Sequence, residues 1–301
     1  MTTAYERRTY KRNHIKRMHV FDYFNYSFMI IFALITLYPF WYVVIGSLNN
    51  GQDFSGGGVW LWPRVFTTAS YKVVFADDRL WLGFRNTVLK TVIGVITSLI
   101  FTSCTAYGLS SNKLRFKKVF HWINLFTMFF SGGLIPYFMV ISMIGLYDNF
   151  LVYVIPSIYS VYNMLVMSSF FKSISNEIKE AAIIDGAREF TIWWRIYLPL
   201  SKPCLATIGL WIAVGHWNSY MGTMLYTQGT DLMTLQYYLV KLIKQSSVPV
   251  LEGDLAAIQK ETSATTISFA AIVISTIPIF ALYPFLQKYF TKGIMIGSIK
   301  G

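Results

Sequence analysis

The sequence has little charge for its length. Only 13% of the 301 residues are charged, whereas 54% are apolar and 18% are aromatic. Soluble domains carry about 25% charged residues, so this chain has too little polar surface to cover a globule in water. The composition excludes a disordered chain, a cytosolic enzyme and a secreted disulfide-rich domain, and it indicates a membrane protein.

Residues and motifs that support catalysis or metal binding are also scarce. Cys104 and Cys204 lie in apolar stretches without a CxxC spacing, and the four histidines have no metal-ligand spacing. The sequence contains no G-x-x-x-x-G-K-[ST] nucleotide motif and offers no Ser-His-Asp or paired-carboxylate arrangement. We therefore expect no catalytic residue, no metal site and no cofactor in this chain. A passive channel or a permease driven by partner subunits remains.

Six apolar segments are long enough to cross a bilayer, which needs about 20 mostly apolar residues. Apart from Arg85, His121 and Lys288, which lie within three residues of a segment end, Lys90 and His216 are the only Asp, Glu, His, Lys or Arg residues in these segments. Both are expected near a helix end, where the lysine can extend to the membrane surface. The segments cover residues 24–48, 84–109, 119–146, 150–171, 203–225 and 265–290. They predict an all-α polytopic membrane protein with six transmembrane helices.

Positive charge is distributed unevenly between the loops of such a chain. Of the 26 Lys and Arg residues, 18 fall in the N-terminal tail, the loops after spans two and four, the last residues of span six and the C-terminal tail. The positive-inside rule makes that side cytoplasmic, so both termini are expected in the cytoplasm. The basic residues follow membrane topology, which favours anionic lipid as a partner and disfavours nucleic acid.

We divide the chain into a basic cytoplasmic tail (1–23), a first transmembrane helix (24–48), a transmembrane core (82–290) and a cytoplasmic C-terminal tail (291–301).

The cytoplasmic loop over residues 172–202 carries a structural pattern. Ser175 can cap a first helix, which Gly186 ends. Thr191 can cap a second short helix, which Pro199 ends. The pattern predicts a helix–glycine–helix hairpin, which fits either an amphipathic element lying on lipid or a knob for a partner's groove.

The same loop resembles the EAA loop of binding-protein-dependent ABC importers, whose pattern is EAA, three residues, Gly, nine residues, I-x-L-P. This chain has Glu-Ala-Ala at 180–182, Gly186 four residues later, and Ile-Tyr-Leu-Pro at 196–199. It departs from the family at Ser175, where proline is usual, but a serine N-cap serves the same purpose. The resemblance assigns ATPase coupling to Glu180, Ala181, Ala182, Asp185, Gly186, Ile196, Leu198 and Pro199.

Further segments resemble the carbohydrate-uptake branch of those importers. They are FSGGLIP at 130–136, HWN at 216–218, TLQ at 234–236 and the ending at 292–301. The first and last of these resemble oligosaccharide and polysaccharide permeases related to the second permease subunit of maltose importers. The resemblance covers essentially the whole chain. It implies a type I ABC importer permease fold in the bacterial plasma (inner) membrane.

The resemblance also implies partners. They are a homologous second permease subunit, two ATPase subunits that bind ATP and Mg, and an extracytoplasmic sugar-binding protein, so this chain would not itself be an enzyme. The C-terminal tail of maltose-type permeases inserts between the ATPases, which assigns ATPase contact to Gly297, Lys300 and Gly301, unless the terminus is simply frayed. We expect residues 232–243 to form a short outer helix that meets the binding protein or packs over the span ends.

Spans four and five offer groups suited to a sugar. Sugars present hydroxyl groups and flat CH faces, so their sites combine amides or hydroxyls with aromatic rings. The candidates for the substrate pathway are Tyr159, Tyr162, Asn163, His216, Trp217, Asn218 and Tyr220. The alternative is structural, because aromatic residues also form interfacial belts and buried asparagines tie helices together.

Two other functions stay open at this point. One is an ABC importer permease for a non-sugar substrate such as peptides, amino acids or metals, which would share the EAA loop. The other is a passive channel or a membrane scaffold, which would leave the structured EAA loop unexplained.

Overall fold

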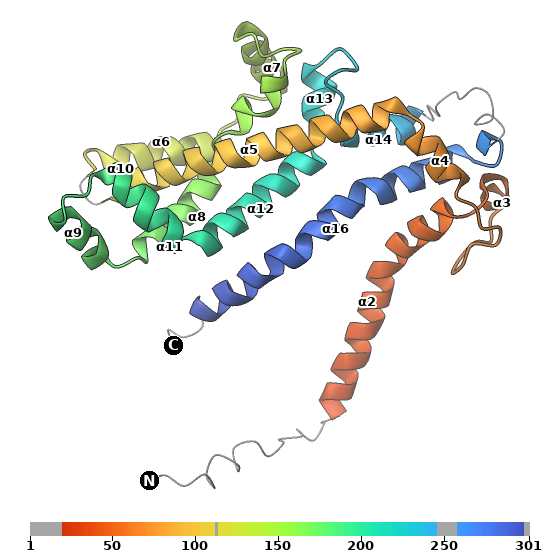
Figure 1. Ribbon diagram of the computed structural model, residues 1–301, viewed down its shortest axis with the longest axis horizontal. Helices are drawn as coiled ribbons and strands as arrows, with labels where there is room; N and C mark the ends of the chain where they lie inside the picture. The colour runs from red at the N-terminus through yellow and green to blue at the C-terminus, as the bar shows by residue number, and fades with distance from the viewer. Residues whose placement is uncertain (1–19, 112–113, 246–257, 298–301) are drawn as a thin grey trace.

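The protein, seen in a computed structural model that describes residues 20–111, 114–245 and 258–297, is built from helices and has no β-sheet in these ranges (Figure 1). The longer helices are α2 (Val20–Ser47), α5 (Asp78–Ser110), α6 (Lys117–Phe129), α7 (Leu134–Met143), α8 (Val161–Lys172), α12 (Lys202–Asn218), α14 (Leu235–Gln245) and α16 (Ala264–Gly297). The shorter ones are α3 (Gly51–Ser55), α4 (Ala69–Phe75), α9 (Asn176–Ile184), α10 (Glu189–Ile192), α11 (Leu198–Leu200) and α13 (Met221–Tyr226).

Three helices in the described part are long and apolar enough to cross a membrane. Their candidate spans are Phe21–Ser47, Asp78–Ser110 and Ala264–Ala281. Three further candidates are bent helix pairs: α6 with α7 at 113°, the turns at 150–157 with α8 at 47°, and the α10–α11 segment with α12 at 83°. The described residues therefore contain up to six spans if each bent pair crosses as one.

Two predicted spans contain a break between separate α-helices, and a third, 150–171, begins as 3₁₀ turns before α8 starts at Val161. The segment 119–146 breaks between α6 and α7, where Gly133 has a φ of +88° that an L-residue rarely adopts. The segment 203–225 ends its first helix at Asn218, and α13 is a separate short helix. Both breaks allow the chain to turn inside a segment that composition alone predicts to be one rod.

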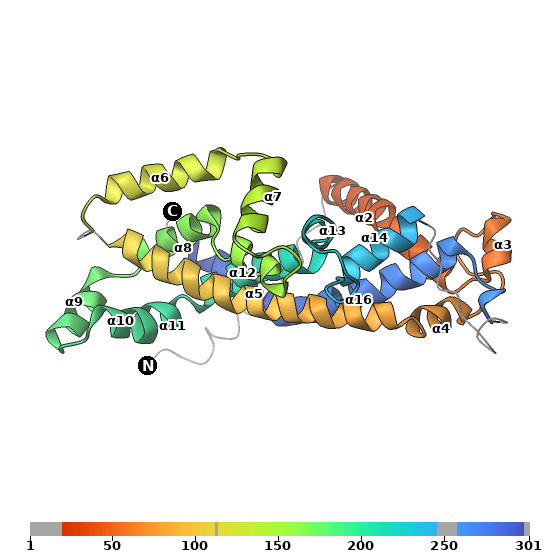
Figure 2. The same cartoon turned by 90° about the horizontal axis from the view of Figure 1, so that it is seen from above.

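Helix α5 is the axis of the fold. It packs against α8, α12 and α14 along its length, while α16 packs against α2, α4 and α12. Figures 1 and 2 show α9 and α10 at one end of this axis and α3 and α4 at the other. One 33-residue helix therefore connects the two ends of the molecule.

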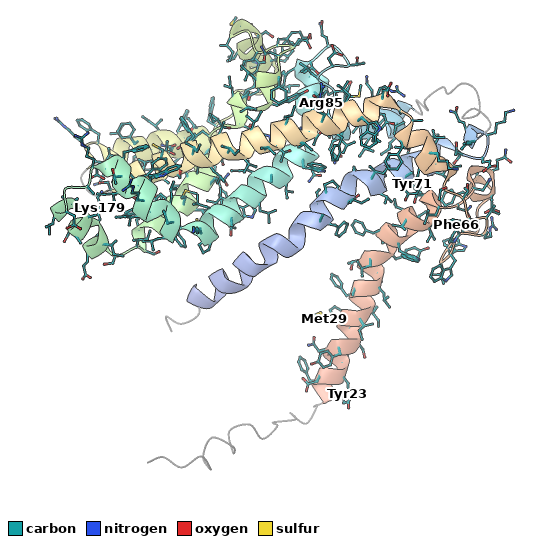
Figure 3. The ribbon with its side chains drawn as sticks, viewed as in Figure 1. Tyr23, Met29, Phe66, Tyr71, Arg85 and Lys179 are labelled. Carbon is teal, nitrogen blue, oxygen red and sulfur yellow. The ribbon has the colours of Figure 1, made fainter. Side chains whose placement is uncertain are left out.

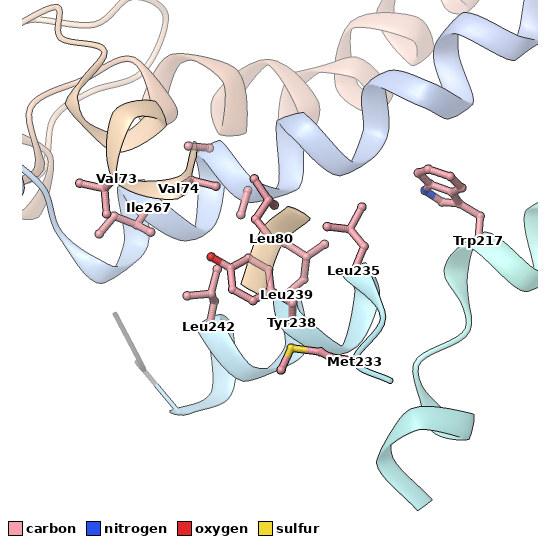
Figure 4. Close-up of a cluster of buried hydrophobic side chains, with 12 residues drawn as sticks. Val73, Val74, Leu80, Trp217, Met233, Leu235, Tyr238, Leu239, Leu242 and Ile267 are labelled. Carbon is pink, nitrogen blue, oxygen red and sulfur yellow. The ribbon is translucent and has the colours of Figure 1, made fainter. Parts of the chain in front are cut away.

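The end that carries α4 and α14 is closed by a buried apolar cluster (Figure 4). The apolar face of α14, including Leu235, Leu239 and Leu242, is buried against its neighbours. The Tyr238 hydroxyl in this cluster donates a 2.8 Å hydrogen bond to Asp77 Oδ2 at the N-terminus of α5. The helix predicted over residues 232–243 is present as α14, which begins at Leu235, and its apolar face packs over the span ends.

Polar side chains of α5 hold the segment that leads into α14. Asn86 Nδ2 donates to the carbonyls of Asp231 at 2.6 Å and Met233 at 2.9 Å. The Leu235 amide donates to Thr87 Oγ1 at 2.9 Å. We name residues 231–245 the outer strap, because these bonds fix the segment across α5.

The surface of α2 is apolar and uncovered over most of its length. Figure 3 shows Tyr23 and Met29 on the part of α2 that extends away from the rest of the molecule, and both are more than half exposed. A helix that is apolar on all sides is typical of contact with lipid or with other transmembrane helices.

Candidate functional sites

The first candidate site is the α9–α10 hairpin, which we define as residues 175–200. Helix α9 begins at Asn176 and is capped by Ser175, whose Oγ accepts a hydrogen bond from the Glu177 amide at 3.2 Å. Glu177 lies in the first turn, where a carboxylate interacts favourably with the positive end of the helix dipole. The serine therefore starts the helix as the sequence predicts.

A glycine elbow ends α9. The Gly186 amide bonds to the Ile183 carbonyl at 3.0 Å and the Ala187 amide bonds to the Ala182 carbonyl at 2.9 Å. This pair of bonds forms a Schellman motif, which places its glycine in the left-handed region. Gly186 has a φ of +79°, so the elbow that the sequence predicts is present.

The second half of the hairpin differs from the prediction. Helix α10 begins at Glu189 after Arg188, which makes no side-chain cap hydrogen bond, so the predicted Thr191 cap is wrong. The chain then passes through a π-helical stretch, Trp193–Tyr197. Pro199 lies in the first turn of α11 and does not end a helix, because a first-turn residue needs no amide donor.

Charged and aromatic contacts tie the hairpin to α5. Lys179 forms a 2.9 Å ion pair with Glu189 across the elbow. Lys179 Nζ also lies 4.9 Å from the centre of the Tyr107 ring, and the Tyr107 hydroxyl donates to the Glu189 carboxylate. Tyr107 belongs to α5, so the two arms of the hairpin and the central helix meet at one point.

One side of the hairpin is buried and the other side is exposed. Ala182, Ile192 and Tyr197 are buried in a cluster with α5, α8 and α12. Ile184 and Phe190, at the far end of the hairpin, have 85% and 70% of their surface exposed. An exposed apolar tip on a rigidly anchored base is suited to insertion into a groove of another protein.

The structure places the predicted coupling residues along this hairpin. Glu180 lines a hollow of about 410 Å³ together with Lys179 and Ile183. Glu180, Ala181, Asp185, Gly186 and Pro199 are exposed, Ile196 and Leu198 are half-buried, and Ala182 is buried.

The second candidate site is a cavity of about 300 Å³ beside α5. Helices α5, α7, α8, α12 and α13 and the turn at 150–157 contribute to its walls. Its polar lining includes the amide of Asn163, the imidazole of His216, the hydroxyl of Ser98 and the ammonium of Lys90. Three tyrosine rings, those of Tyr137, Tyr153 and Tyr226, complete it.

Lys90 is enclosed in this cavity wall. Its side chain is on the thirteenth residue of α5, has 1% of its surface exposed, and donates from Nζ to the Ser219 carbonyl at 2.8 Å. The expectation that Lys90 extends to the membrane surface is wrong. Helix α5 begins six residues before the predicted span, so the lysine lies deeper in the helix than the sequence predicts.

His216 reaches the cavity from the last turn of α12. Its Nε2 lies 3.4 Å from Ser157 Oγ. A Cβ added to Gly94 would lie 2.4 Å from that same Nε2, so only glycine gives the ring this position against α5.

The structure separates the predicted pathway residues into two groups. Asn163 and His216 line the cavity. Trp217 belongs to the buried cluster of Figure 4, where its Nε1 donates to the Ser275 carbonyl at 3.1 Å. Asn218 is exposed at the end of α12, and Tyr220 follows it half-buried.

The two span-four tyrosines lie outside the cavity. Tyr159 donates to Asn124 Oδ1 of α6 and packs edge-on against Phe101 of α5. Tyr162 is exposed and lies against Trp211. Lys90, Ser98 and Tyr153 also line the cavity, and none of them was predicted as a lining residue. One signal was available for Lys90: it is a cation inside an apolar segment with no acid within one helical turn.

Known proteins resemble this chain along nearly its whole length. The family described as "Binding-protein-dependent transport system inner membrane component" matches residues 16–296. The polygalacturonan/rhamnogalacturonan transport system permease protein YtcP of Bacillus subtilis is 35% identical over 94% of this chain and 99% of its own length.

Two solved structures share the fold. One is from a bacterial ABC transporter involved in the import of the acidic polysaccharide alginate, with a TM-score of 0.84 and 38% identity over 90% of this chain and 96% of that one. The other is from a bacterial alginate ABC transporter in complex with a pentasaccharide-bound periplasmic protein. Its TM-score is 0.55 at 15% identity, over 88% of this chain and 93% of that one, and it supports the fold alone.

Proposed function

The chain belongs to the family of binding-protein-dependent transport system inner membrane components, and from that premise we propose that it is the permease subunit of an ABC importer for an oligosaccharide or polysaccharide. The observation that carries the proposal is its end-to-end similarity to a polygalacturonan/rhamnogalacturonan permease. The higher-identity structural relative also comes from a polysaccharide importer. The cavity agrees with a sugar, since it combines tyrosine rings with an amide, an imidazole and a hydroxyl.

The proposal includes a membrane topology. Each bent helix pair counts as one span, which gives six spans with both termini in the cytoplasm of a bacterium. The α9–α10 hairpin then lies on the cytoplasmic side and the outer strap on the opposite side, in agreement with the uneven distribution of Lys and Arg.

The proposal also includes the partners. A second permease subunit covers the uncovered apolar helix faces, two ATPase subunits bind ATP and Mg, and an extracytoplasmic binding protein delivers the saccharide. The exposed tip and anchored base of the hairpin support its role as the element that docks on an ATPase. The C-terminal contact proposed for Gly297, Lys300 and Gly301 begins where α16 ends, and residues 298–301 lie outside the described residues.

The test is ATP turnover by the importer reconstituted with its partner permease and ATPases. We expect a binding protein loaded with uronate or neutral oligosaccharides to stimulate turnover, and the same protein loaded with peptides to leave it unchanged. Stimulation by peptides alone would support the non-sugar alternative. Flux of saccharide through the permease without ATP would identify a channel.

A further inference from the structure

We propose that the cavity beside α5 takes an anionic saccharide, one that carries carboxylates on its sugar rings, and that Lys90 pairs with a carboxylate of this substrate. The inference rests on the proposed function, because it names the chemical class of the saccharide. It arises from a buried charge that the described part of the chain does not neutralise.

The first observation is that Lys90 lacks a counter-ion. No carboxylate among the described residues lies within ion-pair distance of its ammonium group, which instead contacts the Ser219 carbonyl and lies 5.3 Å from the centre of the Tyr153 ring. Burial of an ammonium group is costly unless an anion and hydrogen bonds compensate for the lost water. The site therefore favours a ligand that brings negative charge.

The second observation is spare hydrogen-bonding capacity on the same wall. An ammonium group has three N–H donors, and the bond to the Ser219 carbonyl uses one of them. Ser98 Oγ, two turns further along α5, is buried with 1% of the residue exposed and has no hydrogen-bond partner among the residues that the structure describes. Native proteins rarely leave such a hydroxyl unsatisfied, so Ser98 is suited to bond a ligand held at Lys90.

The third observation is the mixture of groups around the ammonium. Tyr153 is held in place by hydrogen bonds from its hydroxyl to the Leu232 carbonyl at 2.6 Å and with Thr223 at 3.0 Å. Its ring is thereby fixed beside the ammonium group. The ammonium group lies over this ring, and the rings of Tyr137 and Tyr226 in the same lining supply aromatic surface for a sugar ring. Aromatic surface for the sugar ring beside a cation for its carboxylate matches a uronate residue.

A structural role for Lys90 makes a different prediction. The Ser219 carbonyl lies at the C-terminus of α12, where a cation interacts favourably with the helix dipole. If Lys90 only capped α12, a neutral donor would replace it, and its loss would affect every substrate equally.

The experiment measures ATP-driven uptake by the complete importer in proteoliposomes with its binding protein. The probes are a uronate oligosaccharide and its methyl ester, which keeps the sugar backbone but has no charge. The variants are Lys90→Gln, which keeps a donor for the Ser219 carbonyl, and Lys90→Arg, which keeps the charge. Lys72→Gln is the matched control, because Lys72 is exposed on α4 away from the cavity.

We expect Lys90→Gln to lower uptake of the uronate relative to the ester by about tenfold, the scale of one charge-assisted contact. Lys90→Arg should retain most of the preference and Lys72→Gln all of it. The binding protein is the same in each preparation, so its own selectivity cancels between variants. Equal loss of both probes, or uronate uptake unchanged in Lys90→Gln, would overturn the inference.

Failure of the proposed function has a separate signature. If the wild-type importer transports neutral saccharides and rejects uronates, the anionic assignment is wrong and the saccharide permease stands. If no saccharide is transported or stimulates ATP turnover, the proposed function itself is wrong.

Discussion

The elbow of the α9–α10 hairpin lets the coupling proposal be tested through backbone conformation alone. Gly186 has a φ of +79°, and a Cβ built on it meets no atom within 4 Å. A substitution there introduces backbone strain without a steric clash inside this chain. The left-handed conformation costs an L-residue about 1–2 kcal/mol, and asparagine tolerates it better than most.

The backbone strain lowers the population of hairpins that have the native elbow. A cost of about 1–2 kcal/mol lowers the ratio of hairpins with the native elbow to hairpins without it by about 5- to 30-fold. Gly186→Ala and Gly186→Leu should show the same loss, because the space around the position is open. Gly186→Asn should lose much less.

The assay is the affinity of the purified ATPase for the detergent-solubilised permease pair, with membrane insertion measured in parallel. We expect weaker ATPase binding for the alanine and leucine variants, near-native binding for the asparagine variant and unchanged insertion for all three. Native affinity in the alanine variant would refute the role of the elbow in docking. A leucine variant far weaker than the alanine variant would show that side-chain size at the ATPase surface, and not backbone strain, causes the loss.

Three further predictions concern the cavity and the outer strap. Gly94→Ala should force the His216 ring away from α5 and cost about 1–3 kcal/mol, seen as a lower thermal midpoint and slower transport. Gly108→Ala on the same helix meets no atom of the described residues and should lower neither. Burial and the adjacent carboxylate raise the pKa of Tyr238 above its ordinary value. As the pH rises, the unfolded state therefore loses the Tyr238 proton before the folded state does. The thermal midpoint should fall as the pH rises above about 10, and it should fall less steeply in Tyr238→Phe. Asn86→Ala should leave two strap carbonyls without their donor at a cost of about 1–3 kcal/mol, and faster hydrogen exchange confined to residues 231–239 would confirm it; unchanged exchange would contradict it.

Local patterns predicted the parts of the fold that depend on neighbouring residues. The Ser175 cap, the Gly186 elbow and the apolar face of α14 follow from spacing within one or two turns, and the structure contains all three. The break at Gly133 depends on tertiary packing, because a glycine in an apolar segment fits both a continuous and a bent helix.

The candidate cavity was less predictable for the same reason. Asn163 and His216 were predicted because polar groups in apolar spans suggest a pathway, and both line the cavity. Trp217 was predicted together with them but belongs to the buried cluster. Lys90 was misplaced because the start of α5 depends on Asp77, whose side chain accepts the Arg79 amide and caps the helix before the apolar run begins.

The length and continuity of helix α5 determine how the sites attached to it can move. Its 33 residues form one uninterrupted helix of about 50 Å, whereas the neighbouring candidate spans are jointed by bends of 47° to 113°. This one helix binds the outer strap through Asn86, lines the cavity with Lys90 and contacts the hairpin through Tyr107. If α5 tilts as one helix and keeps these contacts, the outer strap, the cavity and the hairpin move together. The bent spans then accommodate the movement at their breaks.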